Sequence, residues 1–152
     1  IINDDVDLAI RLDADGVHVG QQDMEAKEAR RRLGPEKIIG VSARTVEQAV
    51  QAWKDGADYL GVGAVFHTGS KADARQIEHE TLRRICSAVP IPAVAIGGIA
   101  EKNALELAGS GISGIAVISA IFAEEDVEAA AARMKKLAER IVGAQEQQGR
   151  KV

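Results

Sequence analysis

Six runs of apolar residues recur along the chain, and each run ends in a polar or glycine-rich cluster. The runs cover residues 1–4, 16–20, 38–42, 59–66, 92–98 and 115–119. Amphipathic patterns at helical spacing follow at 7–12, 24–33, from 45 onward, 80–89, 101–108 and 127–141. Apolar strands that alternate with such helices are typical of parallel βα units, whose strands are buried on both faces. The pattern predicts an α/β fold in which the strand-end clusters meet at one edge of a sheet.

A TIM (β/α)8-type barrel accounts best for this repeat. Its units recur about every 20–25 residues, and a complete barrel usually needs about 200 residues or more. This chain has 152 residues and starts with Ile1 inside a strand. We therefore expect its six βα units to be the third to the eighth of a barrel, with the first two units absent from the chain. We predict one partial-barrel domain over residues 1–143 and a polar C-terminal tail over 144–152.

Composition and charge exclude several classes of function. The net charge of −4 does not suit a surface that binds a nucleic acid backbone. No apolar run reaches the roughly 18 residues that a bilayer span needs, and no basic-then-apolar signal segment opens the chain. The single cysteine, Cys86, cannot form an internal disulfide and lies on an apolar stripe, so we expect it to be buried. These features predict a soluble cytoplasmic protein without nucleic acid or membrane partners, and leave open whether it forms a homo-oligomer.

Acidic side chains follow the first two runs. Asp4 comes directly after Asn3 at the end of the first run, and Asp23 follows the second. Neighbouring strand ends lie close together in a barrel, so the two carboxylates are candidates to face one cavity. They suit Mg²⁺, a hard cation that shares its oxygen ligands with substrate phosphates. The alternative is that each residue makes an Asx-type turn or a helix cap.

The next two clusters carry hydroxyl groups. Ser42 ends the third run, where its hydroxyl can hydrogen-bond a polar ring or make a turn. The fourth run leads into His67-Thr68-Gly69-Ser70-Lys71. This loop offers backbone amides, hydroxyls and an ammonium to a phosphate or diphosphate, although its glycine spacing is not that of a nucleotide-binding P-loop. It is equally consistent with a solvated connection, and its length would also suit a lid.

The last two runs end in small residues that suit an anion. Gly97-Gly98 ends the fifth run and Ile118-Ser119 ends the sixth. Paired glycines allow an anion to approach the backbone closely. The last two strands of TIM barrels often build a phosphate site from loop amides and a helix N-terminus. We therefore predict a phosphate site between these two strand ends.

Taken together, the clusters resemble one known family. The motifs are Ile2-Asn3-Asp4-Asp5, Gly16-Val17-His18-Val19-Gly20-Gln21-Gln22-Asp23, Gly40-Val41-Ser42-Ala43, Gly61 to Lys71, Ala95-Ile96-Gly97-Gly98-Ile99 and Val117-Ile118-Ser119-Ala120. Their order and spacing are similar to those of thiamine-phosphate synthase, also called thiamine-phosphate pyrophosphorylase. The resemblance runs from Ile1 to about Ala130. Any one motif is weak, whereas all six together are specific.

The resemblance implies a TIM-barrel transferase of thiamine biosynthesis. The family joins hydroxymethylpyrimidine diphosphate to a thiazole phosphate with Mg²⁺ and yields thiamine phosphate and diphosphate. By matching motif, Asp4 and Asp23 would ligate Mg²⁺, and the catalytic residues would be Lys71 on the leaving diphosphate and Ser42 on the aminopyrimidine. The other substrate-binding residues that the resemblance implies are Asn3 on the diphosphate, Thr68 and Ser70 on a closing loop, and Gly98, Ile118 and Ser119 on the thiazole phosphate.

The chain also departs from the family pattern. His67 stands where the family usually has Pro, and Ser70 stands where it has Thr. Ser70 keeps the hydroxyl, and we expect His67 to change only the stiffness of the loop. The family's Gln-x-Arg-x-Lys motif, which grips the diphosphate, belongs to a strand that would precede Ile1. We therefore predict that this chain alone is a weak or inactive enzyme.

Two other functions stay open at this stage. A tautomerase of the same fold, which aromatises the thiazole phosphate with a histidine, would need neither a diphosphate site nor the acid pair. His67 is the residue that keeps this function open, whereas Asp4, Asp23 and Lys71 argue against it. The chain could also be a non-catalytic phosphate-ligand binder, or a remnant whose barrel closes only with another chain.

Overall fold

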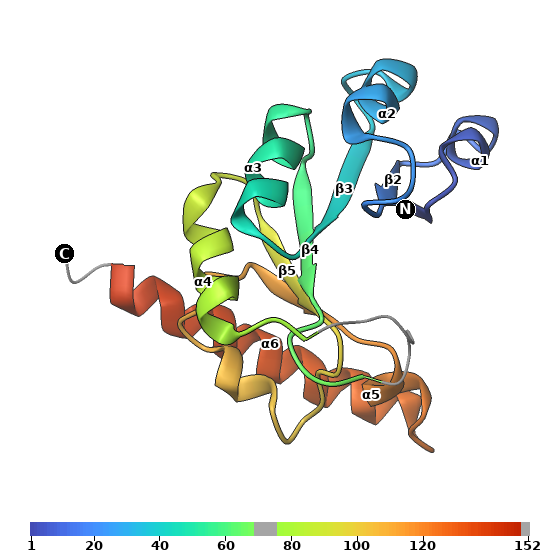
Figure 1. Cartoon of the computed structure of the whole chain (residues 1–152). Coiled ribbons are helices and arrows are strands. Elements are labelled where there is room, and N and C mark those ends of the chain that lie inside the picture. Colours follow the sequence, from blue (N-terminus) through green and yellow to red (C-terminus); the bar gives the residue numbers. More distant parts are fainter. Residues whose placement is uncertain (69–75, 150–152) are drawn as a thin grey trace.

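Six parallel strands form the centre of the fold. The computed structural model describes residues 1–68 and 76–149, with side chains up to residue 143. The strands are β1 (Ile2–Asn3), β2 (Gly16–Val19), β3 (Ile38–Ala43), β4 (Tyr59–Gly63), β5 (Ala93–Ile96) and β6 (Gly114–Ala116). Each strand pairs in parallel with the next one along the chain (Figure 1). This order confirms the predicted βα repeat.

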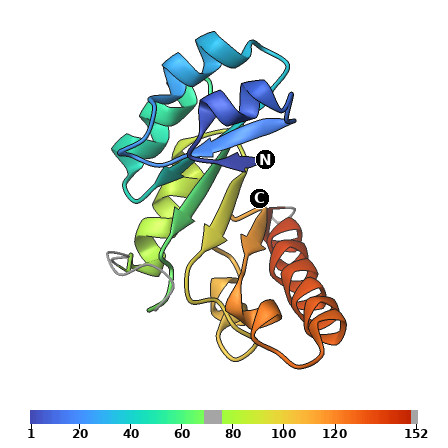
Figure 2. The same cartoon turned by 90° about the vertical axis from the view of Figure 1, so that its right-hand side faces the viewer.

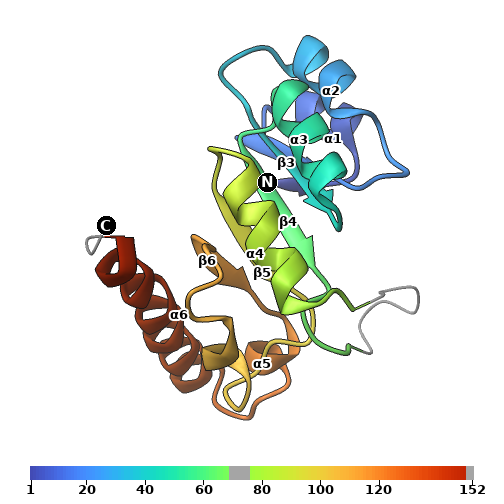
Figure 3. The same cartoon turned by 60° about the vertical axis from the view of Figure 1, so that its left-hand side comes forward.

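Helices follow the strands and cover the outer face of the sheet. They are α1 (Val6–Arg11), α2 (Ala26–Leu33), α3 (Val46–Lys54), α4 (His79–Ala88), a 3₁₀ turn η1 (Ala104–Leu107), α5 (Ser119–Phe122) and α6 (Val127–Gly149). Figure 3 shows α3 and α4 in front of β3 to β5, and Figure 2 shows α6 beside β6. Within the described part of the chain, none of the helices has the length and apolar character of a membrane span.

The hydrophobic core lies between the sheet and these helices. Leu60 and Val62 of β4 are fully buried, as are Leu82 and Ile85 of α4. Alternate residues along a strand point to opposite faces. Leu60 and Val62 point to the outer face, so Tyr59, Gly61 and Gly63 lie on the inner face. The outer face of the sheet is therefore packed, and the inner face is free to form a site.

Two helix starts are fixed by local hydrogen bonds. The Thr45 hydroxyl accepts a hydrogen bond from the Gln48 N–H (3.2 Å), and the Gln48 side-chain oxygen accepts one from the Arg44 N–H (2.8 Å). The Thr45-x-x-Gln48 spacing is typical of a capping box, and here the Gln48 side chain bonds the N–H of Arg44, one residue before the N-cap Thr45. The Asp5 carboxylate caps α1 by accepting from the Leu8 N–H at 2.8 Å. Both caps come directly after strand ends, so they also anchor the edge that carries the site.

Several predicted boundaries differ from the structure. β4 ends at Gly63, and the chain then bends at Val65 and Phe66. The helix predicted at 101–108 is only the 3₁₀ turn η1, because its buried residues, Ala104 and Leu107, are three residues apart and suit the tighter turn. α5 was not predicted, since four residues are too few to show a periodic pattern. α6 continues to Gly149, through residues that the sequence analysis assigned to the tail.

The apolar stripe Val46, Ala49, Val50 and Trp53, at helical spacing, predicts that Trp53 packs into the core, and the structure contradicts this prediction. Its exposed fraction is 41%, whereas Ala49 and Ala52 of the same helix are buried. Cys86 agrees better with its prediction, because it is half-buried against the core.

The sheet is curved and open. β1 and β6 are its two edge strands, and Figure 2 shows them at opposite sides of the half-barrel. The described residues thus form a half-barrel-like parallel sheet of six strands, and not a closed barrel of eight. The predicted TIM-type fold is confirmed as a parallel α/β sheet of six βα units.

Candidate functional site

Two adjoining hollows lie over the inner face and the carboxyl-end edge of the sheet. The first, the acidic hollow, is about 590 Å³ and its lining includes Asn3, Asp4, His18, Gln21, Asp23 and Tyr59. The second, the glycine hollow, is about 150 Å³ and its lining includes Gly63, Thr68, Gly97, Gly98, Ile118 and Ser119. Ser42, Arg44, Gly61, Ile96 and Ala116 line both hollows. The two hollows are therefore parts of one continuous site.

The acidic hollow takes its carboxylates from the ends of β1 and β2. Asp4 has a left-handed backbone (φ 66°), a conformation that Asp tolerates, and its N–H donates to the His18 carbonyl at 2.7 Å. Asp23 accepts a hydrogen bond from the Gly20 N–H at 2.7 Å through Oδ2. This bond reaches back three residues, so it is neither the Asx-type turn nor the helix cap considered for Asp23, and both carboxylates line the same hollow. This bond and a ligand role are compatible, because a carboxylate that accepts one hydrogen bond has further lone pairs.

The donor set of this hollow suits a hard cation held jointly with a ligand. Over residues 1–68 and 76–143, no three His, Cys, Asp or Glu side chains gather into a group that could hold a metal by themselves. Mg²⁺ keeps several waters and is commonly bound through one or two carboxylates plus substrate phosphates. Asp4 and Asp23 match that smaller requirement.

Hydrogen bonds between side chains cross the floor of the acidic hollow. His18 Nδ1 lies 2.9 Å from the Tyr59 hydroxyl, and His18 Nε2 lies 3.0 Å from the Ser42 hydroxyl. Gln21 donates through Nε2 to the Ser42 carbonyl at 2.7 Å. Burial raises the pKa of the Tyr59 phenol. Ser42, one of the predicted site residues, is thus held through both its side chain and its backbone.

The glycine hollow is shaped by the turn after β5. Gly97 and Gly98 both have left-handed backbones, with φ of 98° and 67°. A Cβ on Gly98 would lie 2.3 Å from the His67 carbonyl oxygen, so no side chain fits there. Asn103 donates through Nδ2 to the Gly98 carbonyl at 2.9 Å. The turn is therefore held firmly in a form that brings its backbone to the wall of the hollow.

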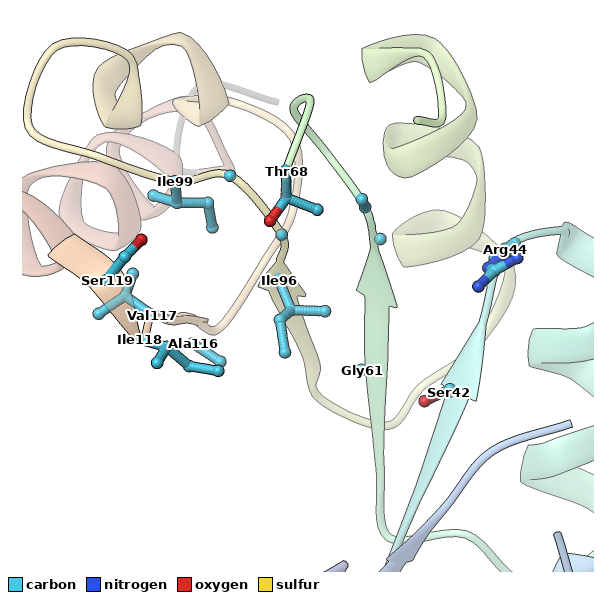
Figure 4. A pocket seen from close by; sticks show the side chains of 14 residues that line it. Ser42, Arg44, Gly61, Thr68, Ile96, Ile99, Ala116, Val117, Ile118 and Ser119 are labelled. Carbon is cyan, nitrogen blue, oxygen red and sulfur yellow. The ribbon is translucent and has the colours of Figure 1, made fainter. Parts of the chain in front are cut away.

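The opposite wall of the glycine hollow comes from the segment after β6. Ser119 begins α5, and Ile118 precedes it with an exposed fraction of 62%. Figure 4 shows Ser119 and Ile118 on one side of Ile96, with Ser42 and Arg44 on the other side. The first N–H groups of a helix have no partner within the helix, so this wall offers backbone donors as well as a hydroxyl.

The structure brings most of the predicted site residues together. Asn3, Asp4, Asp23 and Ser42 line the acidic hollow. Ser42, Thr68, Gly98, Ile118 and Ser119 line the glycine hollow. Ser70 and Lys71 lie outside the described residues. His67 is exposed and is absent from both linings.

Sequence reasoning missed four residues of the site: His18, Gln21, Arg44 and Tyr59. Among the described residues, Arg44 is the one Lys or Arg that lines either hollow. A signal for His18 was present in the alternation Val17-His18-Val19, which puts the imidazole on the face opposite two buried valines. No comparable signal exists for Arg44, because it follows β3 in an irregular connection.

Comparison with known proteins gives one consistent result. A family model described as thiamine monophosphate synthase matches residues 1–121. The thiamine-phosphate synthase of Ruminiclostridium cellulolyticum is 50% identical over 137 residues, which cover 90% of this chain and 65% of that protein. The thiamine-phosphate synthase of Clostridium tetani is 55% identical over 130 residues, which cover 86% of this chain and 62% of that protein. The chain thus spans slightly less than two thirds of the length of these relatives.

A solved structure supports the same assignment. Thiamine phosphate pyrophosphorylase from Pyrococcus furiosus superposes with a TM-score of 0.83 at 48% sequence identity, covering 93% of this chain and 67% of that one. The sequence comparison and the structural comparison therefore point to the same family. With a family model matched over residues 1–121, the chain belongs to the thiamine monophosphate synthase family.

Proposed function

We propose that this chain carries the site at which a thiamine-phosphate synthase joins hydroxymethylpyrimidine diphosphate to thiazole phosphate. The observation that carries the proposal is the pair of adjoining hollows, one acidic and one walled by glycine backbone, which share Ser42. A reaction between two phosphorylated molecules needs two such compartments in contact. The names of the relatives support the same reaction.

In the acidic hollow we assign the pyrimidine substrate. Asp4 and Asp23 would hold Mg²⁺ together with the diphosphate, and Asn3 would contact the diphosphate as an amide donor. Bound there, Mg²⁺ would neutralise charge on the leaving group. Ser42 would hydrogen-bond the aminopyrimidine ring. Arg44 would add a cationic side chain at the boundary with the second hollow.

In the glycine hollow we assign the thiazole phosphate. Gly98 and Ser119 both line this hollow, and Ile118 adds an apolar surface for the ring. Backbone N–H groups on a glycine turn suit a phosphate, because they approach it closely. Thr68 adds a hydroxyl at the rim. The resemblance assigns Lys71 to the leaving diphosphate and Ser70 to the closing loop, and both residues lie outside the described residues.

The reaction needs no nucleophile from the protein. The C–O bond to the diphosphate breaks with its electron pair going to the leaving group, and the thiazole nitrogen lone pair forms the new C–N bond. The protein has to neutralise the leaving charge, hold the two rings in line and exclude water from the cationic intermediate. The small residues on the inner face, such as Gly61 and Ala116, leave room for two rings to meet.

Several finer statements belong to the same proposal. They are a closed eight-unit barrel, Mg²⁺ dependence and a cytoplasmic location.

Substitution of Asp23 separates the proposed function from its rivals. D23N should weaken magnesium-dependent binding of hydroxymethylpyrimidine diphosphate by about tenfold or more, because it removes a charged contact, and should leave thiazole phosphate binding unchanged. Isothermal titration of each ligand, with and without Mg²⁺, measures both effects. D13N is the matched control, since Asp13 pairs with Lys37 on the surface and lines neither hollow.

The outcomes distinguish the alternatives clearly. A D23N protein that binds the diphosphate substrate like the wild type, with the same magnesium dependence, would refute the assignment of the acidic hollow. A tautomerase would keep its activity in D23N. The histidine that kept the tautomerase open, His67, lines neither hollow.

A further inference from the structure

His18 occupies the centre of the inner face and connects two hydroxyl groups. Its ring lies between Tyr59 of β4 (Nδ1 to hydroxyl, 2.9 Å) and Ser42 of β3 (Nε2 to hydroxyl, 3.0 Å). The three residues come from three adjacent strands. All three are partly buried, and all three line the acidic hollow. None of the roles assigned so far uses His18 or Tyr59.

Strand register and glycine fix the position of the imidazole. His18 pairs with Gly40 across β2 and β3, and Gly40 pairs with Tyr59 across β3 and β4. A Cβ on Gly40 would lie 2.4 Å from His18 Nδ1 and 2.1 Å from the Tyr59 ring, and a Cβ on Gly61 would lie 2.9 Å from His18 Cε1. The two glycines thus provide the space in which the rings meet. The imidazole is seated between strands and is not a freely rotating surface side chain.

The chemistry of the two hydroxyls gives this connection a direction. A phenol is a stronger acid than an aliphatic hydroxyl and therefore the better hydrogen-bond donor. Burial raises the pKa of Tyr59, which keeps its proton in place. Tyr59 then donates to Nδ1 of His18, and a neutral imidazole that accepts at Nδ1 carries its proton on Nε2. Nε2–H donates to the Ser42 oxygen, so the hydrogen of Ser42 is left to donate into the hollow.

We propose that Tyr59 and His18 are positioning residues that fix Ser42 as a hydrogen-bond donor to a ring nitrogen of the pyrimidine substrate. The proposal rests on the proposed function, which places the aminopyrimidine at Ser42. In an aminopyrimidine, the ring nitrogen beside the amino group is an acceptor. In the deaminated oxo form of the same ring, that nitrogen carries hydrogen and is a donor. A Ser42 hydroxyl whose hydrogen is left for the ligand would therefore favour the amino form, which offers it an acceptor.

The backbone contact of Gln21 supports this arrangement. Its Nε2 donates to the Ser42 carbonyl at 2.7 Å, which holds the β3 strand end against the turn after β2. Ser42 is thereby fixed at its backbone while His18 fixes its hydroxyl. Sites that orient a polar group in this way reject analogues with the wrong donor pattern far more strongly than apolar pockets reject a change of size.

Selectivity between the two rings tests the proposal. We would titrate the protein, with Mg²⁺, with hydroxymethylpyrimidine diphosphate and with its 4-oxo analogue, and take the ratio of the two dissociation constants. Y59F removes only the hydroxyl that sets the direction, so His18 can carry its proton on Nδ1 and Ser42 can donate its hydrogen to Nε2 instead of to the ligand. We expect the ratio in favour of the amino form to fall at least about fivefold in Y59F and H18Q. H79Q on α4 is the matched control and should keep the wild-type ratio.

Each outcome supports or overturns one of the two proposals. If Y59F and H18Q weaken the binding of both ligands by the same factor, His18 and Tyr59 are only structural, and the proposal that they orient Ser42 is wrong. If the wild type binds neither pyrimidine diphosphate, the proposed function itself fails. The tautomer of His18 in the ligand-free protein, read from its imidazole ¹⁵N shifts, is independent of both titrations. Protonation at Nε2 supports the proposed chain of hydrogen bonds from Tyr59 through His18 to Ser42, and protonation at Nδ1 overturns it.

Discussion

The glycine turn after β5 offers the sharpest single perturbation, Gly98→Ala. Gly98 has φ of 67°, where an L-residue costs about 1–2 kcal/mol. The new Cβ would also lie 2.3 Å from the His67 carbonyl oxygen and 2.9 Å from the Phe66 carbonyl carbon. Both neighbours are backbone, so the turn has to move, and such overpacking costs about 1–3 kcal/mol. Together the two effects predict a loss of about 2–5 kcal/mol in the free energy of unfolding.

The same movement should disable the glycine hollow. The turn is tied to its surroundings through Asn103, which donates to the Gly98 carbonyl, and through the Phe66 N–H, which donates to the Gly97 carbonyl at 3.0 Å. Displacing the turn carries its backbone away from the Ser119 wall. Titration calorimetry should therefore show thiazole phosphate binding weakened at least about tenfold in G98A, and urea unfolding measures the loss of stability.

Gly34→Ala provides the control for backbone strain alone. Gly34 also has a positive φ (81°), but a Cβ there would have open space within 4 Å, and the residue lines neither hollow. G34A should lose about 1–3 kcal/mol of stability and bind thiazole phosphate like the wild type. The reasoning is refuted if G98A is no less stable than G34A and binds the ligand with unchanged affinity.

Two further predictions concern parts of the chain outside the site. Burial raises the pKa of Cys86 from 9.0 to about 11, so its thiolate is about a hundredfold scarcer in the native protein near neutral pH. A thiol reagent should therefore label Cys86 much faster in urea than in buffer. Equal labelling rates would contradict the packing of Cys86. Arg30 donates to the carbonyls of Gly34, Lys37 and Gly56, so R30M should cost about 2–4 kcal/mol in urea unfolding. R31M removes only the exposed ion pair Arg31–Glu28 and should leave the urea midpoint unchanged; an R30M midpoint equal to that of R31M would refute the account.

The order of strands was predictable from the sequence because buried strands and helices require apolar residues at regular spacing. Leu60 and Val62, for example, are apolar because they face helices. Each apolar run ends where the strand reaches the edge of the sheet that carries the two hollows. The clusters at those ends contained Asp4, Asp23 and Ser42, and all three line the acidic hollow. The turn residues Gly97 and Gly98 were equally visible, because a positive φ selects glycine.

The inner face was not predictable in the same way. Whether His18 meets Ser42 or Tyr59 depends on the register between strands, and an apolar run does not set that register. The glycines opposite His18 make sense only once the pairing is known.

The central claim is that two phosphorylated ligands occupy adjoining hollows that meet at Ser42. Amide NMR shifts recorded during separate titrations test it most directly. Thiazole phosphate should shift the amides of Gly98 and Ser119, hydroxymethylpyrimidine diphosphate with Mg²⁺ should shift those of Asp4 and Asp23, and both should shift Ser42. Two ligands that shift one and the same set of amides, or that leave Ser42 unmoved, would contradict the account.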